Sequence, residues 1–217
     1  MTATVDGYEW RYLDTDSHQL GPGATPGRTL VLLHGFGASK ETFVRLAGLF
    51  SGAYRVVVPD LLGFGESARP SQISFHPAAQ ASRVVALLDA LNVRGPVHVA
   101  GNSMGGLITA YMALNHAERL ASVSLICAAG VRSPNPSALD RLHANGETPL
   151  LVRSIEDFDR ILGMIFYKPP PIPVRLSYFF LYLKILLNLY FLFDLIFFSS
   201  FCTFLFFHLY HIFLLNS

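Results

Sequence analysis

The 217-residue chain carries little charge, and this shortage excludes two classes of protein. Charged residues make up 14% of the sequence and hydrophobic residues 52%, whereas an average soluble domain is about 25% charged. The composition excludes an intrinsically disordered protein, which needs low hydrophobicity and high net charge. The formal net charge of +1 leaves no basic excess for binding a phosphate backbone, so we expect no nucleic-acid partner.

Cysteine is also scarce, since Cys127 and Cys202 are the only two. Two cysteines cannot build a disulfide framework, and no Cys-x-x-Cys pattern or Cys/His cluster suggests a metal site. The first residues, MTATVDGY, lack both the basic region and the apolar core of a secretory signal. We therefore expect a protein without bound metal and without a signal peptide.

The composition changes abruptly near Pro173 and Val174. Residues 1–173 contain all 17 glycines, all 13 prolines and every alanine, whereas residues 174–217 contain 11 of the 18 phenylalanines. Only Arg175, Lys184 and Asp194 are charged in this second part. The two parts differ so much in composition that they require separate interpretations.

Residues 29–128 alternate between short apolar runs and amphipathic patterns. The apolar runs predict buried strands over 29–33, 55–58, 97–100 and 122–128. The spacing of apolar residues predicts helices over 43–50, 81–91, 104–116 and, further along, 155–165. This alternation indicates an α/β protein with a mostly parallel sheet. Because the predicted strands are apolar on both sides, we expect helices on both faces of the sheet.

The third predicted strand runs directly into Gly101-Asn102-Ser103-Met104-Gly105-Gly106, and a helix follows. This is the G-x-S-x-G pattern in its required context of strand, sharp turn and helix. Small residues on either side of Ser103 allow strand and helix to approach, and the turn forces the serine into a strained backbone conformation. We predict that Ser103 is a nucleophile. The alternative is a glycine-rich turn whose serine only caps the helix.

The first predicted strand ends at His34-Gly35-Phe36-Gly37. In a parallel sheet this loop lies at the same edge as the Ser103 turn. We predict that the backbone N–H groups of Phe36 and Met104 form an oxyanion hole, in which each donor is worth roughly 3–4 kcal/mol. For His34 we favour a role as a hydrogen-bonded loop residue over a role as a base.

The sequence contains HGFGASKETF at 34–43, PDLLGFGES at 59–67, GNSMGG at 101–106 and YKPPPIP at 167–173. Together these motifs resemble the α/β-hydrolase superfamily, and most of all its bacterial cell-associated lipases and monoacylglycerol lipase group. The resemblance covers about residues 28–173. It implies an α/β-hydrolase fold, Ser103 as the nucleophile, Phe36 and Met104 as oxyanion-hole donors, an ester or lipid substrate, and no cofactor.

The resemblance also implies a division of the chain. Residues 1–27 form an N-terminal lead-in, residues 28–130 the N-terminal half of the hydrolase core, and residues 131–173 the start of a helical cap. Residues 174–217 form a separate Phe/Leu-rich tail. On this interpretation the α/β-hydrolase fold is truncated after the start of the cap.

A serine nucleophile needs a histidine base and an acid that orients it, in the chain order Ser, Asp or Glu, His. His208 and His211 lie in an apolar run without a turn signal, and Asp194 is an isolated charge in the same run. The remaining candidates fall outside the motifs or suit turns and solvated positions: His18, His76, His98, His116, His143, Asp60, Asp140, Asp157 and Asp159. We identify neither acid nor base, and predict that the chain as written lacks a working triad.

Residues 174–217 have three interpretations. The favoured one is translated sequence that was not selected as protein, through a frameshift, an unspliced intron or a mis-assembled gene model. The second is a membrane segment, because residues 195–215 contain no Lys, Arg, Asp or Glu and are long enough to span a bilayer. The third, a core element of the hydrolase, is disfavoured because the tail has no glycine for turns. The sequence leaves the localisation open between cytoplasmic and membrane-associated, because it depends on whether the tail is genuine.

The expected function is that of a serine ester hydrolase, a lipase or esterase that forms an acyl-enzyme on Ser103, with this chain itself inactive. Two alternatives stay open. One is a carbon–carbon bond hydrolase of the same superfamily, some members of which share the Asn-Ser-Met-Gly-Gly turn. The other is a non-catalytic, truncated or membrane-tethered fragment. Epoxide hydrolases and haloalkane dehalogenases are disfavoured, since they have an aspartate in place of Ser103.

Overall fold

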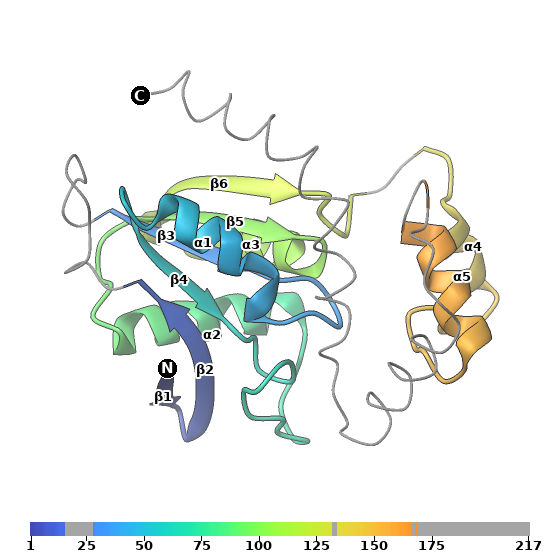
Figure 1. Cartoon of the computed structure of the whole chain (residues 1–217), viewed down its shortest axis with the longest axis horizontal. Helices are drawn as coiled ribbons and strands as arrows, with labels where there is room; N and C mark the ends of the chain where they lie inside the picture. The colour runs from blue at the N-terminus through green and yellow to red at the C-terminus, as the bar shows by residue number, and fades with distance from the viewer. Residues whose placement is uncertain (16–27, 132–133, 166–167, 169–217) are drawn as a thin grey trace. The chain divides into compact units, whose positions relative to one another are not determined.

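A computed structural model describes residues 1–15, 28–131, 134–165 and 168 (Figure 1). The chain divides into two compact units, residues 1–130 and residues 131–217. The predictions for residues 174–217, including His208, His211 and Asp194, lie outside the described residues, as does the prediction for His18. Within the described part of the chain, no helix is both long enough and apolar enough to cross a membrane.

The first unit contains a six-stranded sheet in the order β1-β2-β4-β3-β5-β6 (Figure 1). Its parallel strands are β3 (Thr29–Leu33), β4 (Arg55–Pro59), β5 (Val97–Asn102) and β6 (Leu120–Ile126). An antiparallel hairpin of β1 (Thr2–Val5) and β2 (Tyr8–Asp14) joins the sheet through β4. The prediction of a mostly parallel sheet is therefore confirmed.

The helices of this unit are α1 (Val44–Phe50), α2 (Pro77–Ala90) and α3 (Met104–Asn115), with the 3₁₀ turns η2 (Lys40–Phe43) and η3 (Ala117–Arg119). All three helices overlap the segments that the apolar spacing predicts, although α2 begins at Pro77, four residues before the predicted start. Four strand boundaries differ from prediction, among them the end of β4 at Pro59 and the start of β6 at Leu120. β5 continues to Asn102, and β6 ends at Ile126 because Cys127 adopts a positive φ of 45°, which an extended strand does not allow.

Helices cover both faces of the sheet because alternate strand residues point to opposite sides. On one face, Phe43 and Ala47 pack against Leu30, Leu32, Val56, Val58 and Ala100. On the other face, α2 and α3 pack against Val31, Leu33, Val57, Val97 and Val99. The expectation of a sheet covered by helices on both faces is confirmed for β3, β4 and β5.

The outermost strand departs from this expectation. Val123 and Leu125 in β6 are 42% and 50% exposed. β6 lies at the edge of the sheet, and among the described residues it pairs only with β5. An edge strand has neighbours on one side only, so its apolar side chains are less covered than those of the inner strands.

The β1–β2 hairpin is not among the predicted elements. Asp6 and Gly7 have φ values of 51° and 81°, and Val5 pairs with Tyr8 across this two-residue turn. Trp10 is only 1% exposed and packs with Leu62 and Leu87. The first residues of the chain therefore belong to the sheet and its core.

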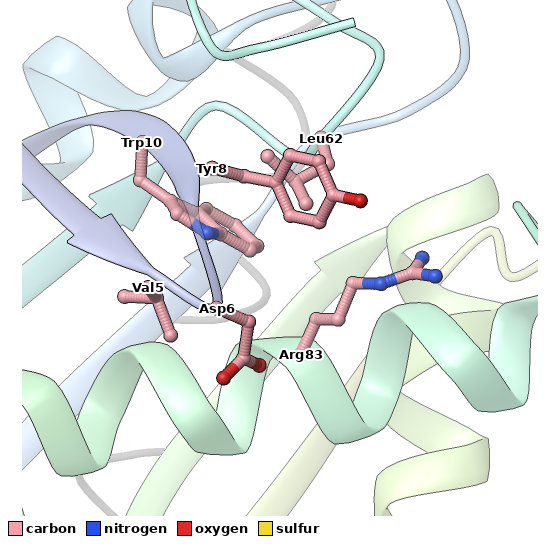
Figure 2. A pocket seen from close by; sticks show the side chains of 6 residues that line it. All are labelled: Val5, Asp6, Tyr8, Trp10, Leu62 and Arg83. Carbon is pink, nitrogen blue, oxygen red and sulfur yellow. The ribbon is translucent and has the colours of Figure 1, made fainter. Parts of the chain in front are cut away.

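A small pocket lies where this hairpin faces α2 (Figure 2). It is lined by Val5, Asp6, Tyr8, Trp10, Leu62 and Arg83. None of these residues belongs to the Ser103 turn or to the His34–Gly37 loop. The pocket therefore contributes no group to the candidate active site.

The second unit contains two described helices, α4 (Ala138–Ala144) and α5 (Ile155–Ile165). Ser137 and Asp140 form a capping box at the start of α4, in which each side chain accepts from the other residue's backbone N–H. Phe158, Ile161 and Leu162 are buried on one side of α5. The spacing of these apolar residues explains why α5 has the bounds that the sequence pattern predicts.

Candidate active site

Ser103 lies at the junction between β5 and α3, and its backbone is strained. Its φ of 51° and ψ of −112° lie outside the regions that serine ordinarily adopts. The Ser103 N–H donates to the Ile126 carbonyl at 3.0 Å, and the Ser103 carbonyl accepts from Leu107 and Ala129 at 3.1 and 3.0 Å. These bonds to β6, to α3 and to the segment after β6 hold the strained conformation in place. The Ser103 side chain makes no capping hydrogen bond to α3, and the residue is half-buried.

Glycines on both sides of Ser103 allow the backbones around it to approach. A Cβ at Gly101 would overlap the Gly105 carbonyl and the Thr109 hydroxyl. A Cβ at Gly105 would overlap the Leu33 carbonyl of β3 and lie 2.7 Å from the His34 carbonyl oxygen. Strand β5, helix α3 and strand β3 therefore meet at a spacing that leaves no room for a side chain at either position.

The loop after β3 lies beside Ser103. A Cβ built on Gly35 would lie 3.4 Å from the Ser103 Cβ and 3.2 Å from the Asn102 Oδ1. Within the described part of the chain, the Phe36 N–H has no hydrogen-bond acceptor. Met104 is the first residue of α3, so its N–H has no acceptor inside the helix. Among the described residues, neither N–H group predicted to form the oxyanion hole has a hydrogen-bond acceptor. Met104 follows Ser103 in the chain, and Phe36 follows Gly35, which lies beside Ser103.

His34 connects two loops through both of its ring nitrogens. Nδ1 lies 2.8 Å from the Gly35 carbonyl oxygen, and Nε2 accepts from the Leu61 N–H at 3.1 Å. The ring is fully buried, and this burial lowers the pKa of His34, although the Gly35 carbonyl and the Asp60 charge oppose the shift. A neutral ring with both nitrogens occupied is a structural link rather than a base for Ser103.

A buried ion pair between Lys40 and Asp60 lies at the end of the same loop. One Asp60 carboxylate oxygen accepts from the Lys40 N–H at 2.6 Å, and the other accepts from the Lys40 Nζ and the Glu66 N–H, both at 2.9 Å. The Lys40 Nζ also donates to Glu66 at 2.6 Å and contacts Glu41 at 2.9 Å. The sequence pattern indicates a turn-forming role for Asp60 but gives no sign of its partner Lys40.

The environment of this ion pair shifts the pKa of Lys40 and that of Glu66. Burial by itself would lower the pKa of Lys40, but hydrogen bonds to Glu66, Glu41 and Asp60 outweigh it and raise the pKa. The hydrogen bond and charge of Lys40 in turn lower the pKa of Glu66. Lys40 is therefore charged throughout the physiological range, and its charge is neutralised by the surrounding carboxylates.

Within the described residues of the first unit, no histidine or carboxylate hydrogen-bonds to the Ser103 hydroxyl. His76 accepts from the Ala78 N–H at the start of α2, His98 is bonded to Ser122, and His116 is bonded to Ser82. In the second unit, Asp140 caps α4, and Asp157 accepts from the Arg153 N–H and from Arg160. No group of three metal-binding side chains is found in the part of the chain that the structure describes.

Comparison with known proteins gives a consistent set of relatives. Residues 28–150 match a family model described as the alpha/beta hydrolase fold. Lipase 1 from Psychrobacter immobilis is 39% identical over 152 residues, which are 70% of this chain and 47% of the relative. A 2-hydroxymuconate semialdehyde hydrolase from Pseudomonas putida is 34% identical over 139 residues, 63% of this chain and 47% of the relative.

Among solved structures, a membrane phospholipase A described as a bacterial virulence factor is 40% identical to this chain. The two superpose with a TM-score of 0.71 over 82% of this chain and 55% of that protein. The chain spans about half the length of the curated relatives that it matches.

Proposed function

The chain belongs to the alpha/beta hydrolase fold family, and we propose that Ser103 is the nucleophile of a carboxylic ester hydrolase acting on acylglycerol-like lipids. The observation that carries the proposal is the strained Ser103 at the start of α3, with the loop of Gly35 beside it. It is supported by the Phe36 and Met104 N–H groups, which have no acceptor among the described residues. The 39% identity with Lipase 1 supports an ester of a lipid as the substrate class.

In the proposed reaction the Ser103 hydroxyl oxygen attacks the ester carbonyl carbon. The carbonyl oxygen becomes an oxyanion that accepts from the Phe36 and Met104 N–H groups, and the N-terminus of α3 favours the same negative charge. Loss of the alcohol leaves the acyl group on Ser103, and water then releases it. The proton of the hydroxyl must pass to a base, which the described residues of the first unit do not supply. We therefore expect the chain alone to form the acyl-enzyme poorly.

The test is covalent labelling of Ser103 by an alkyl fluorophosphonate, with imidazole added as the base. The Ser103 oxygen bonds to phosphorus, fluoride leaves with the electron pair of the P–F bond, and imidazole takes the hydroxyl proton. We expect mass spectrometry to locate the adduct on Ser103 and to find none in a Ser103→Ala variant. A folded chain that carries no adduct at Ser103 would refute the proposed function.

A second candidate is hydrolysis of a carbon–carbon bond, favoured by the 34% identity with the 2-hydroxymuconate semialdehyde hydrolase. The same nucleophile and oxyanion hole would serve it. Protection of Ser103 from labelling separates the two, because a bound substrate excludes the reagent. Stronger protection by a monoacylglycerol supports the ester hydrolase, whereas stronger protection by a vinylogous diketone supports the carbon–carbon bond hydrolase.

A further inference from the structure

The loop that carries Phe36 is attached to the turn at residues 59–67 at both of its ends. At one end, the His34 Nε2 accepts from the Leu61 N–H at 3.1 Å. At the other end, the Lys40 N–H donates to the Asp60 carboxylate at 2.6 Å. Two consecutive residues after β4 therefore hold both ends of the segment that contains the proposed oxyanion donor.

The same turn also contacts the middle of the loop. The Phe64 ring meets the Phe36 ring edge-to-face at a centroid distance of 5.6 Å, and the His34 ring at 5.7 Å. The Phe64 N–H in turn donates to the Leu61 carbonyl at 2.9 Å. Asp60, Leu61 and Phe64 thus all contact the segment 34–40, and we call these three residues its support.

Asp60 is fixed on every side within this support. Its N–H donates to the Arg11 carbonyl at 2.8 Å, and its carbonyl accepts from the Ser67 hydroxyl at 2.7 Å. A Cβ at Gly65 would overlap the Asp60 carboxyl group, so the turn closes directly over it. The Asp60 side chain has no exposed surface and that of Lys40 is 7% exposed. Removing Lys40 would leave the buried Asp60 carboxylate without its cation, and removing Asp60 would leave Lys40 with only Glu41 and Glu66 as partners.

We propose that Asp60, through its ion pair with Lys40, is a positioning residue for the oxyanion hole. An oxyanion donor acts only when it is already held at about 2.7–3.1 Å from the developing charge. The Lys40–Asp60 pair limits the movement of residues 35–39, and with it the movement of the Phe36 N–H relative to Ser103. This inference rests on the proposed function, because it assigns Asp60 a part in the reaction of Ser103.

The test compares Asp60→Asn with Asp14→Asn in the imidazole-supported labelling of Ser103. Asp14 is a matched control, because its side chain is 6% exposed and is paired with Arg55 at 2.6 Å, in a strand that does not hold the Phe36 loop. Both substitutions neutralise the aspartate of an ion pair, which is buried for Asp60 and partly buried for Asp14, so both are expected to lower the unfolding temperature. Only Asp60→Asn is expected to slow the maximal labelling rate, by about tenfold or more, which is less than the roughly 100- to 1,000-fold loss on removing an oxyanion donor because the Phe36 N–H is displaced and not deleted.

The dependence of labelling on reagent concentration separates positioning from binding. For Asp60→Asn we expect the maximal rate to fall while the concentration for half-maximal rate stays the same. Glu66→Gln provides a second variant if Asp60→Asn does not fold. The Glu66 side chain is 58% exposed, so its substitution is better tolerated, and its carboxylate contacts the Lys40 Nζ at 2.6 Å. Its expected slowing is up to about fivefold, since exposed ion pairs contribute at most about 1 kcal/mol.

Each outcome bears on one of the two proposals. If neither Asp60→Asn nor Glu66→Gln slows labelling, or if Asp14→Asn slows it equally, the positioning role is wrong while Ser103 remains a nucleophile. If the unsubstituted chain is not labelled at Ser103, the proposed function fails and the positioning role fails with it.

Discussion

Replacing Gly105 with alanine tests whether β5, α3 and β3 meet at a spacing that only glycine allows. The added methyl group would overlap the Leu33 carbonyl and lie 2.7 Å from the His34 carbonyl oxygen. Ordinary contacts between a carbon and a carbonyl oxygen begin at about 3.3 Å, so the His34 oxygen would have to move by roughly 0.6 Å and the Leu33 carbonyl by more. Both neighbours are backbone atoms at the end of β3, and unlike a flexible side chain they cannot rotate away.

The expected loss of stability follows from two opposing effects. Overpacking a rigid site costs about 1–3 kcal/mol, and here the strand itself must move, which favours the upper end of that range. Alanine in a helix gains up to about 1 kcal/mol over glycine, and less in the first turn, where Gly105 lies. We therefore expect Gly105→Ala to lower the free energy of unfolding by about 2 kcal/mol, measured by urea unfolding followed by circular dichroism.

Gly48→Ala is the matched control, because it makes the same chemical change inside α1. A Cβ at Gly48 would have no heavy atom within 4 Å beyond its own helix and chain neighbours. This variant should gain about 0.5–1 kcal/mol from helix propensity alone. An unfolding midpoint for Gly105→Ala at or above that of the unsubstituted chain would refute the close approach of the three backbones.

Three further predictions concern pH, activity and the hairpin. Burial lowers the pKa of both His34 and His98, so near and below pH 6.5 the unfolded chain binds more protons than the folded chain. The free energy of unfolding should therefore fall as the pH falls through 6.5, and His34→Gln should make this pH dependence shallower in urea titrations. The chain alone should hydrolyse a p-nitrophenyl ester no faster than its Ser103→Ala variant, and Ser103-dependent turnover would contradict this. Trp10→Ala should cost about 3–5 kcal/mol in the same unfolding assay, whereas a loss below 1 kcal/mol would place the hairpin outside the core.

The strands and helices of the sheet could be predicted because their signals are local. An apolar run such as residues 29–33 or a helical spacing such as that of residues 104–116 involves only neighbours in the chain. The Ser103 turn is local as well, since a strand, two glycines and a helix within ten residues already require the strained backbone. These are the parts of the fold in which sequence neighbours are also the structural neighbours.

The β1–β2 hairpin has a local signal too, but only for its turn. Asp6-Gly7 is a typical pair for a two-residue hairpin turn, and it could have identified the hairpin. The stability of the hairpin depends instead on Trp10, whose partners Leu62 and Leu87 lie far along the chain. Contacts of this range follow from the tertiary fold, and no spacing within residues 1–14 reveals them.

The Lys40–Asp60 pair shows why the support of the oxyanion loop is harder to predict than the nucleophile. Charged residues in glycine-rich loops are usually solvated, so composition favours a surface turn at both positions. The topology reverses this expectation, because β3 and β4 are parallel neighbours and the loops after them emerge at the same edge of the sheet. A lysine in one such loop and an aspartate in the next can then meet and be buried together, as they are here. Where two adjacent parallel strands are predicted, opposite charges in the loops that follow them are therefore candidates for a buried pair that holds the site.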